Sequence, residues 1–144
     1  MNRQQVINEA RQWLGTRFKH QGRLKQIGVD CAGLIVGTAQ NCGYKNVEDI
    51  KDYGHSPDSF TFVNKVKEQM EQIEFKDIKV ADVMFFAFET EPQHVSIVTS
   101  INPLKMIHSF SVARKVVEHD VDEVWINRFK KSGSLCFRFK NIED

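Results

Sequence analysis

The stretch Gly28-Val29-Asp30-Cys31-Ala32-Gly33-Leu34-Ile35 joins a turn, a helix start and a thiol. Asp30 is a favoured N-cap residue, because its carboxylate can accept amide hydrogens that have no partner inside the first turn of a helix. The apolar residues that follow predict a buried helix, which we expect to run to about Asn41 before Gly43 ends it. Cys31 would then occupy the first helical position.

Cys31 has the character of a nucleophile in this setting. The partial positive charge of a helix start favours the thiolate and lowers the pKa of the thiol, which makes a cysteine reactive near neutral pH. The adjacent Asp30 carboxylate opposes that shift, so we also expect a partner imidazole. The alternative is that Cys31 only packs a buried helix as a small apolar residue.

From Val80 onward the chain changes from helical spacing of apolar residues to short segments rich in β-branched and aromatic residues. Upstream, the spacing predicts one helix around Val6 to Leu14 and another that begins near Asp58 or Ser59. Helices followed by strands imply an α+β domain, with N-terminal helices on one face of a C-terminal antiparallel sheet, as in papain-like enzymes. The five expected strands are residues 83–88, 94–99, 105–110, 115–119 and 135–139.

The capped cysteine, the small residues after it and the apolar run resemble the motif of the NlpC/P60 cysteine peptidases, which cut peptides of the bacterial cell wall. The resemblance extends from Arg11 to Phe139 and keeps the order of motifs that this family uses, which is more specific than any single motif. It implies the papain-like fold and a site built from a cysteine, a histidine and a third polar residue. The further motifs are Gly15-Thr16 with Phe18, the Gly-Asp-like pair Ala81-Asp82, the segment His94-Val95-Ser96-Ile97-Val98, and Met106-Ile107-His108.

The chain departs from many family members upstream of the cysteine. Phe18 stands where an aromatic residue with a hydroxyl is common, and His20-Gln21-Gly22 replaces a Trp-Gly-Gly. The segment 17–23 instead resembles a branch encoded in tail gene clusters of phages, prophages and gene-transfer agents. Val116-Val117-Glu118-His119 and Trp125 match further features of that branch. This resemblance implies a protein of the tail tip that opens the wall during DNA entry, with phage tail-tip proteins as partners.

His94 and His108 lie on neighbouring expected strands. If they are directly opposed, a connection of roughly three to five residues around Ile101 joins the strands, and their Cβ atoms lie about 5 Å apart. One imidazole could then orient the other. In the resulting hypothesis, Cys31 attacks a carbonyl carbon, His94 exchanges the proton and His108 fixes the tautomer of His94. The backbone amide of Cys31 is a candidate donor to the oxyanion.

Three residues near the nucleophile are candidates for contact with substrate, namely Phe18, His20 and Asp30. A basic run in the same region could bind the carboxylates of a stem peptide, although a charge run is usually a solvated face. We expect His119 to pair with its neighbour Glu118, and Cys42 and Cys136 to be packing residues. The basic run consists of Arg17, Lys19, Arg23 and Lys25.

The length of 144 residues predicts one domain, residues 1–144, with a single core. Twenty basic side chains against 19 acidic ones give no general electrostatic reason to bind nucleic acid or an acidic membrane surface. Three widely spaced cysteines suit neither a disulfide framework nor a metal knuckle, and we expect no metal or other cofactor. The N-terminus predicts no signal peptide and no membrane span. We therefore expect synthesis in the cytoplasm and action at the cell wall, with transport as part of a virion tail as one route.

The expected function is a peptidoglycan endopeptidase, which by resemblance would cut between D-γ-glutamate and a diamino acid of the stem peptide. An amidase or acyltransferase that uses the same Cys-His pair is the nearest alternative. A tail-assembly protein with weak or lost hydrolase activity is another. A zinc module formed by Cys31, His94 and His108 is a third alternative, but these residues include no closely spaced pair of ligands.

Overall fold

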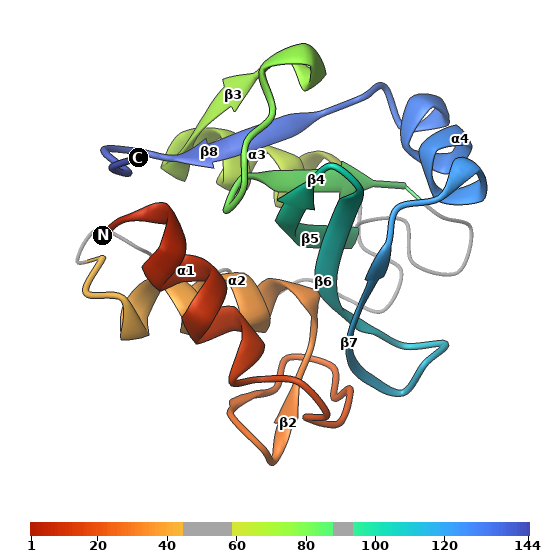
Figure 1. Cartoon of the computed structure of the whole chain (residues 1–144). Helices are drawn as coiled ribbons and strands as arrows, with labels where there is room; N and C mark the ends of the chain where they lie inside the picture. Colours follow the sequence, from red (N-terminus) through yellow and green to blue (C-terminus); the bar gives the residue numbers. More distant parts are fainter. Residues whose placement is uncertain (45–58, 88–93) are drawn as a thin grey trace.

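The computed structural model describes residues 1–44, 59–87 and 94–144 (Figure 1). Its helices are α1 (Arg3–Arg11), α2 (Cys31–Asn41), α3 (Ser59–Gln69), the short 3-10 helix η1 (Phe75–Asp77) and α4 (Glu123–Lys131). Its strands are β1 (Arg23–Leu24), β2 (Gly28–Val29), β3 (Met70–Ile73), β4 (Val83–Phe86), β5 (His94–Ile101), β6 (Leu104–Phe110), β7 (Lys115–Asp120) and β8 (Cys136–Phe139).

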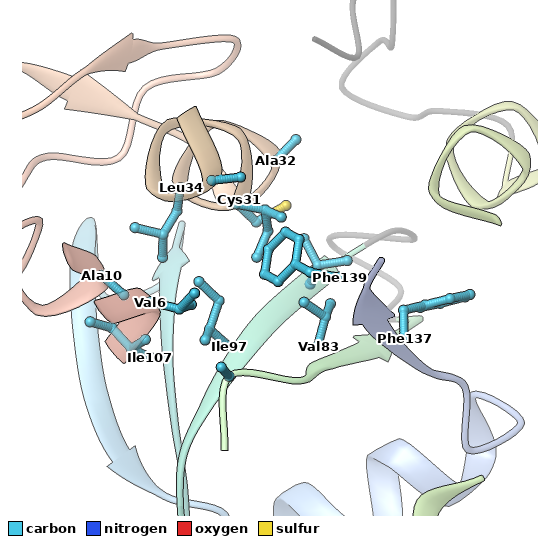
Figure 2. Packing of buried hydrophobic residues seen from close by; sticks show 14 of the residues in the cluster. Val6, Ala10, Cys31, Ala32, Leu34, Val83, Ile97, Ile107, Phe137 and Phe139 are labelled. Carbon is cyan, nitrogen blue, oxygen red and sulfur yellow. The ribbon is translucent and has the colours of Figure 1, made fainter. Parts of the chain in front are cut away.

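Six of these strands form one antiparallel sheet in the order β3-β8-β4-β5-β6-β7. The N-terminal helices α1 and α2 pack on one face, where Val6, Leu34 and Ile97 belong to the same buried cluster (Figure 2). The predicted α+β architecture is therefore confirmed. The C-terminal helix α4, which was not predicted, packs its buried Phe129 against Met84 on the other face.

The sequence placed the main elements well. Helix α2 has the predicted bounds, and Gly43 follows it with a φ of 82°, in the left-handed region that ends helices. All five predicted strands are found to within a few residues, although residues 58 and 88, at the ends of two predicted elements, lie outside the described part of the chain. The sequence did not predict α4, η1, the edge strand β3 or the two-residue strands β1 and β2.

The turn that follows α1 approaches α2 closely at Gly37. A Cβ atom at this position would lie only 2.4 Å from the indole of Trp13, which is almost fully buried. Leu14, the last residue of the helix that the spacing predicted, is 39% exposed and lies beyond the end of α1. No helix in the described residues is long and apolar enough to cross a membrane.

The Ala81-Asp82 pair anchors the start of β4. Ala81 has a φ of 71°, a conformation that glycine adopts at lower cost, which accounts for the Gly-Asp-like character of this motif. Asp82 is fully buried and accepts hydrogen bonds from Arg3, from Nε and Nη2 of Arg138 and from the backbone amide of Lys79, at 2.8–3.0 Å. These contacts tie the N-terminal helix to β4 and β8.

Asp82→Asn should therefore destabilise the fold by about 3 kcal/mol, because it leaves two guanidinium groups without their shared buried counter-charge. Urea unfolding measures this loss as a lower midpoint. Asp144→Asn is the matched control, since Asp144 also pairs with Arg3 but its side chain is 73% exposed. The control should leave the midpoint nearly unchanged. Equal shifts in the two variants would contradict this account of Asp82.

Candidate active site

Cys31 is the first residue of α2, as predicted, and Asp30 is the N-cap residue. Asp30 has extended backbone angles (φ −102°, ψ −174°), and its carboxylate accepts a hydrogen bond from the amide of Gly33 at 2.8 Å. This contact satisfies one of the amide groups that a helix start leaves without an internal acceptor. Cys31 is 8% exposed and projects from the helix start among the side chains of the core (Figure 2).

The Asp30 carboxylate also organises the loop in front of the helix. It accepts hydrogen bonds from the amide of Gln21 at 2.7 Å and from the guanidinium of Arg23 at 2.9 Å. Asp30 is buried, so its carboxylate is used to hold this loop against the helix start. The Arg23 charge also offsets the negative charge next to Cys31. A direct contact of Asp30 with substrate stays a prediction.

Gly33 allows the same loop to lie against α2. A Cβ atom at Gly33 would lie 2.3 Å from the carbonyl oxygen of Gly22 and 2.9 Å from the Arg23 guanidinium. The loop is thus held against α2 by close packing at Gly33 and by the ion pair between Arg23 and Asp30.

The loop before Cys31 is also fixed to the sheet. The hydroxyl of Ser109, which is fully buried in β6, donates a hydrogen bond to the carbonyl of Val29 at 2.7 Å. Phe18 forms a parallel bridge with Val29, so the structure brings this predicted substrate residue to the strand that leads to Cys31. Because Ser109 follows His108 directly, this buried hydrogen bond links the loop before Cys31 to β6, the strand that carries His108.

The structure brings His94 and His108 together. Nε2 of His94 lies 2.5 Å from Nδ1 of His108, and both side chains are completely buried. His94 is the first residue of β5 and His108 lies in β6, so the sheet holds both rings from the backbone. The predicted pairing of these two histidines is confirmed.

The register behind this contact differs from the prediction. Ile97 pairs with Ile107, so the residue that faces His94 along the same register is Phe110, and His108 is its diagonal neighbour. Diagonal neighbours lie farther apart at Cβ than directly opposed residues, so the two histidines meet through their ring nitrogens, Nε2 of His94 and Nδ1 of His108. The predicted connection was too long and was centred too early in the chain, and a β-bulge between Val98 and Ser100 separately shifts the register by one residue. The turn itself consists of Asn102 and Pro103.

His119 extends the pair to a row of three histidines. Nε2 of His108 lies 2.8 Å from Nε2 of His119, and Nδ1 of His119 lies 2.8 Å from the carbonyl oxygen of Asp120. The expected pairing of His119 with Glu118 is wrong. Successive residues of a strand point to opposite faces, and Glu118 instead accepts two hydrogen bonds from Arg11.

Aromatic rings surround this row. Phe110 stacks on His108 with 5.0 Å between ring centroids and 19° between ring planes, and Trp125 of α4 packs edge-on against His108 at 5.3 Å. Trp125 also lies 5.1 Å from the ring of His119. Burial, together with the neighbouring imidazoles of His94 and His119, holds the pKa of His108 far below its ordinary value. The His108 ring is therefore neutral at physiological pH.

Trp125 was identified from the sequence by family resemblance, but the helix that carries it, α4, was not predicted. Asp122 caps α4 by accepting a hydrogen bond from the Trp125 amide at 3.1 Å, and basic residues fill the last turn. This cap, with apolar residues at helical spacing, is a signal that could have identified α4. Its half-buried tryptophan covers the histidine row and also packs against the buried cluster that includes Phe86.

The remaining predicted contacts with substrate stay predictions. His20 is half-buried in the turn after Phe18. Half of the basic run is engaged inside the protein, since Arg23 pairs with Asp30 and Lys25 pairs with Glu9 at 2.6 Å. The other two members, Arg17 and Lys19, are exposed.

The other two cysteines lie in surroundings that suppress the thiolate. Burial raises the pKa of Cys136 to about 12, and Asp82 adds to this shift. Burial and the charge of Glu9 also raise the pKa of Cys42, which is only partly buried. Within the described ranges, no group of three or more His, Cys, Asp or Glu side chains is arranged to hold a metal ion.

Iodoacetamide at neutral pH should therefore modify Cys31 well before Cys42 or Cys136, because the thiolate is the reactive form. Peptide mapping by mass spectrometry identifies the labelled residue. Cys31→Ser is the control and should remove the fast phase of labelling. Preferential labelling of Cys42 would show that the nucleophile is assigned to the wrong residue.

The arrangement suits acyl transfer. A cysteine lies at a helix start, where backbone amides can stabilise an oxyanion, and a buried histidine is oriented by a second, neutral histidine. Helix α2 packs directly against β5 and β6, which carry these histidines.

Several solved structures share this fold. The chain is similar to the NlpC/p60 domain of the peptidoglycan hydrolase SagA, with 17% identity over 96% of this chain and 100% of that one, and a TM-score of 0.65. It is similar to the peptidoglycan hydrolase RipB from Mycobacterium tuberculosis, with 18% identity over 99% of this chain and 65% of that one, and a TM-score of 0.60. A lipoprotein-like NLP/P60 family protein from Staphylococcus aureus subsp. aureus Mu50 is 17% identical over 99% of this chain and 42% of that one, with a TM-score of 0.66.

At these identities the structural likeness establishes the fold. Among curated proteins, none matches the chain significantly. The sequence model of the NlpC/P60 family matches residues 15–133, a span that begins before the nucleophile loop and ends after α4. Because this match covers most of the chain and includes every residue of the candidate site, the chain belongs to the NlpC/P60 family.

Proposed function

We propose that this chain is a cysteine peptidase that hydrolyses peptide bonds in the stem peptides of bacterial peptidoglycan. The observation that carries the proposal is the buried contact between His94 and His108 in a family fold that places Cys31 at the start of α2. Two proteins of similar structure are named as peptidoglycan hydrolases, which supports the substrate class.

The proposed reaction follows from the positions of these groups. Nε2 of His94 contacts His108, so Nδ1 is the nitrogen that takes the proton from Cys31. The thiolate attacks the carbonyl carbon, and the backbone amide of Cys31 donates to the oxyanion. The intermediate collapses as His94 returns the proton to the leaving amine, which leaves an acyl-enzyme. Water, deprotonated by His94, then attacks this thioester and releases the acid and the free thiol.

The bond we propose is the one between D-γ-glutamate and the diamino acid. Its support is the family resemblance of the motifs around Cys31, His94 and His108. Cleavage there frees the amino group of the diamino acid and the γ-carboxyl group of glutamate. An amidase at the same site would instead free the lactyl group of the glycan, and an acyltransferase would join an added amine to the acyl fragment.

Digestion of purified peptidoglycan tests the enzyme, the bond and the nucleophile together. The soluble fragments are separated, and their new termini are identified by mass spectrometry. We expect new amino termini on the diamino acid with the wild-type protein and none with Cys31→Ala. Fragments with free lactyl groups would show that the protein is an amidase and not an endopeptidase. The absence of any Cys31-dependent product would reject hydrolysis and favour a tail-assembly role without catalysis.

We further propose that the protein acts at the cell wall as part of a phage or prophage tail. The support is the resemblance of residues 17–23, Val116–His119 and Trp125 to the tail-associated branch of the family. Induction of the prophage in the source strain, followed by mass spectrometry of purified virions, tests the location. We expect peptides of this chain in virions, and their absence from intact virions would reject the tail role without affecting the proposed activity.

A further inference from the structure

We propose that His119 is a positioning residue that sets the ring tautomer of the catalytic His94 by acting through His108. The inference rests on the proposed function, since it assigns to His94 the role of base for Cys31. It starts from the row of contacts that runs from His94 to His108, from His108 to His119, and from His119 to the carbonyl of Asp120.

The Asp120 carbonyl fixes one end of this row, because a carbonyl oxygen can only accept a hydrogen bond. Nδ1 of His119 must therefore carry a proton. In neutral His119, Nε2 then holds a lone pair and can accept the proton on Nε2 of His108. Nδ1 of His108 in turn accepts the proton on Nε2 of His94. Each ring is thereby assigned one tautomer, and Nδ1 of His94 carries the lone pair that a base needs.

The opposite order of protons would disable the site. If Nδ1 of neutral His108 carried the proton, it would donate to Nε2 of His94, and the proton of neutral His94 would lie on Nδ1. That nitrogen could not accept the proton of Cys31. His108 is held neutral by burial and by its two neighbours, so the acceptor on its far side decides which of its nitrogens is protonated.

The packing preserves this order. His108 is completely buried and stacked on Phe110, and Trp125 covers both His108 and His119. His108 opposes Val117 in the β6–β7 register, so His119, two residues farther along β7, is its diagonal neighbour on the same face. The contact therefore depends on an imidazole that reaches across the strands with its Nε2 atom.

Four variants separate the acceptor from the packing. His119→Phe keeps a ring beside Trp125 but removes the acceptor, and His119→Ala removes both. In His119→Gln the side-chain amide can place an oxygen near the position of Nε2, whereas the shorter His119→Asn cannot. The matched control is Glu118→Gln, which changes the adjacent residue on the other face of β7, where Glu118 pairs with Arg11.

We expect His119→Phe, His119→Ala and His119→Asn to lower kcat on a stem-peptide substrate by about 10- to 100-fold, with little change in KM. His119→Gln should recover most of the lost kcat, and Glu118→Gln should behave as the wild type. A role in folding alone predicts that His119→Phe, which preserves packing, is as active as the wild type. That result, or equal loss in His119→Gln and His119→Phe, would overturn the proposal.

Nitrogen-15 NMR of histidine-labelled protein reads the tautomers without any substrate. At a pH where the rings are neutral, we expect a proton on Nε2 of His94, on Nε2 of His108 and on Nδ1 of His119. In His119→Phe, part or all of the signal of His108 should move to the Nδ1-protonated form. An unchanged tautomer pattern in His119→Phe would reject the role of His119 even if the protein hydrolyses peptidoglycan. If the wild type has no hydrolase activity but His119→Phe still changes the tautomer of His108, the positioning role of His119 is supported and the proposed function is rejected.

Discussion

Cys31→Ala should abolish the release of fragments from peptidoglycan while leaving the protein folded. Alanine removes the sulfur that forms the acyl-enzyme, and removal of a hydrolase nucleophile lowers kcat by about 10⁶-fold. The cost in stability should be small, about 1 kcal/mol, because only one buried atom is lost at the end of a helix. Fragment release is measured by chromatography of digested peptidoglycan, and folding by circular dichroism and urea unfolding.

The two other cysteines provide matched controls. Cys42→Ala and Cys136→Ala should retain full activity, since neither thiol lies at a helix start and burial raises the pKa of both. Cys136→Ala should still lower the unfolding midpoint, because Cys136 of β8 is completely buried in the cluster that contains Met84 of β4 and Phe129 of α4. Normal fragment release by Cys31→Ala would reject the mechanism.

His94→Gln should lower kcat by at least about 10⁴-fold, because an amide cannot take up and return a proton. Glutamine is the informative replacement for this buried residue. Its amide can still donate to Nδ1 of His108, so the variant avoids leaving an unpartnered acceptor in the interior. Steady-state hydrolysis of a soluble stem peptide measures the loss.

Alkylation of Cys31 provides a second readout for the same variant. In the wild type, proton transfer to His94 supplies thiolate near neutral pH, so iodoacetamide should react quickly there. In His94→Gln, the reaction should require a higher pH, because the proton must leave to solvent. If His94→Gln kept both its hydrolytic rate and its alkylation profile, another residue would have to be the base.

The local sequence determined the main elements and the position of the candidate nucleophile, Cys31, at a helix start. Asp30, the apolar run after it and Gly43 fix α2 through capping and burial, which are properties of a few adjacent residues, and the helix has the predicted bounds. The strands follow from short apolar segments for the same reason. The ordered motifs also identified the family, since they reflect chain-wide spacing rather than contacts.

The register of the sheet depended on more than local pattern. The position of the turn at Asn102 and Pro103 and a β-bulge in β5 together place the partner of His94 two residues from the predicted one, and local sequence pattern predicted neither feature. His94 and His108 still meet, because a shift of two residues keeps side chains on the same face. The alternation of side chains along the strands predicted that His94 and His108 share one face of the sheet. Only the register of the folded sheet decided that their rings meet diagonally.

The surroundings of the site were decided by tertiary structure alone. Sequence proximity suggested that Glu118 is the partner of His119, but strand geometry sends these neighbours to opposite faces, where they meet Arg11 and His108. Trp125 covers the histidine row from a helix that enters from the other side of the sheet. The sequence predicted which residues are candidates for the chemistry, because helix capping and strand alternation are local. The tertiary structure decided which ring nitrogen of each histidine contacts its neighbour. These contacts join separate strands, which come together only when the chain folds.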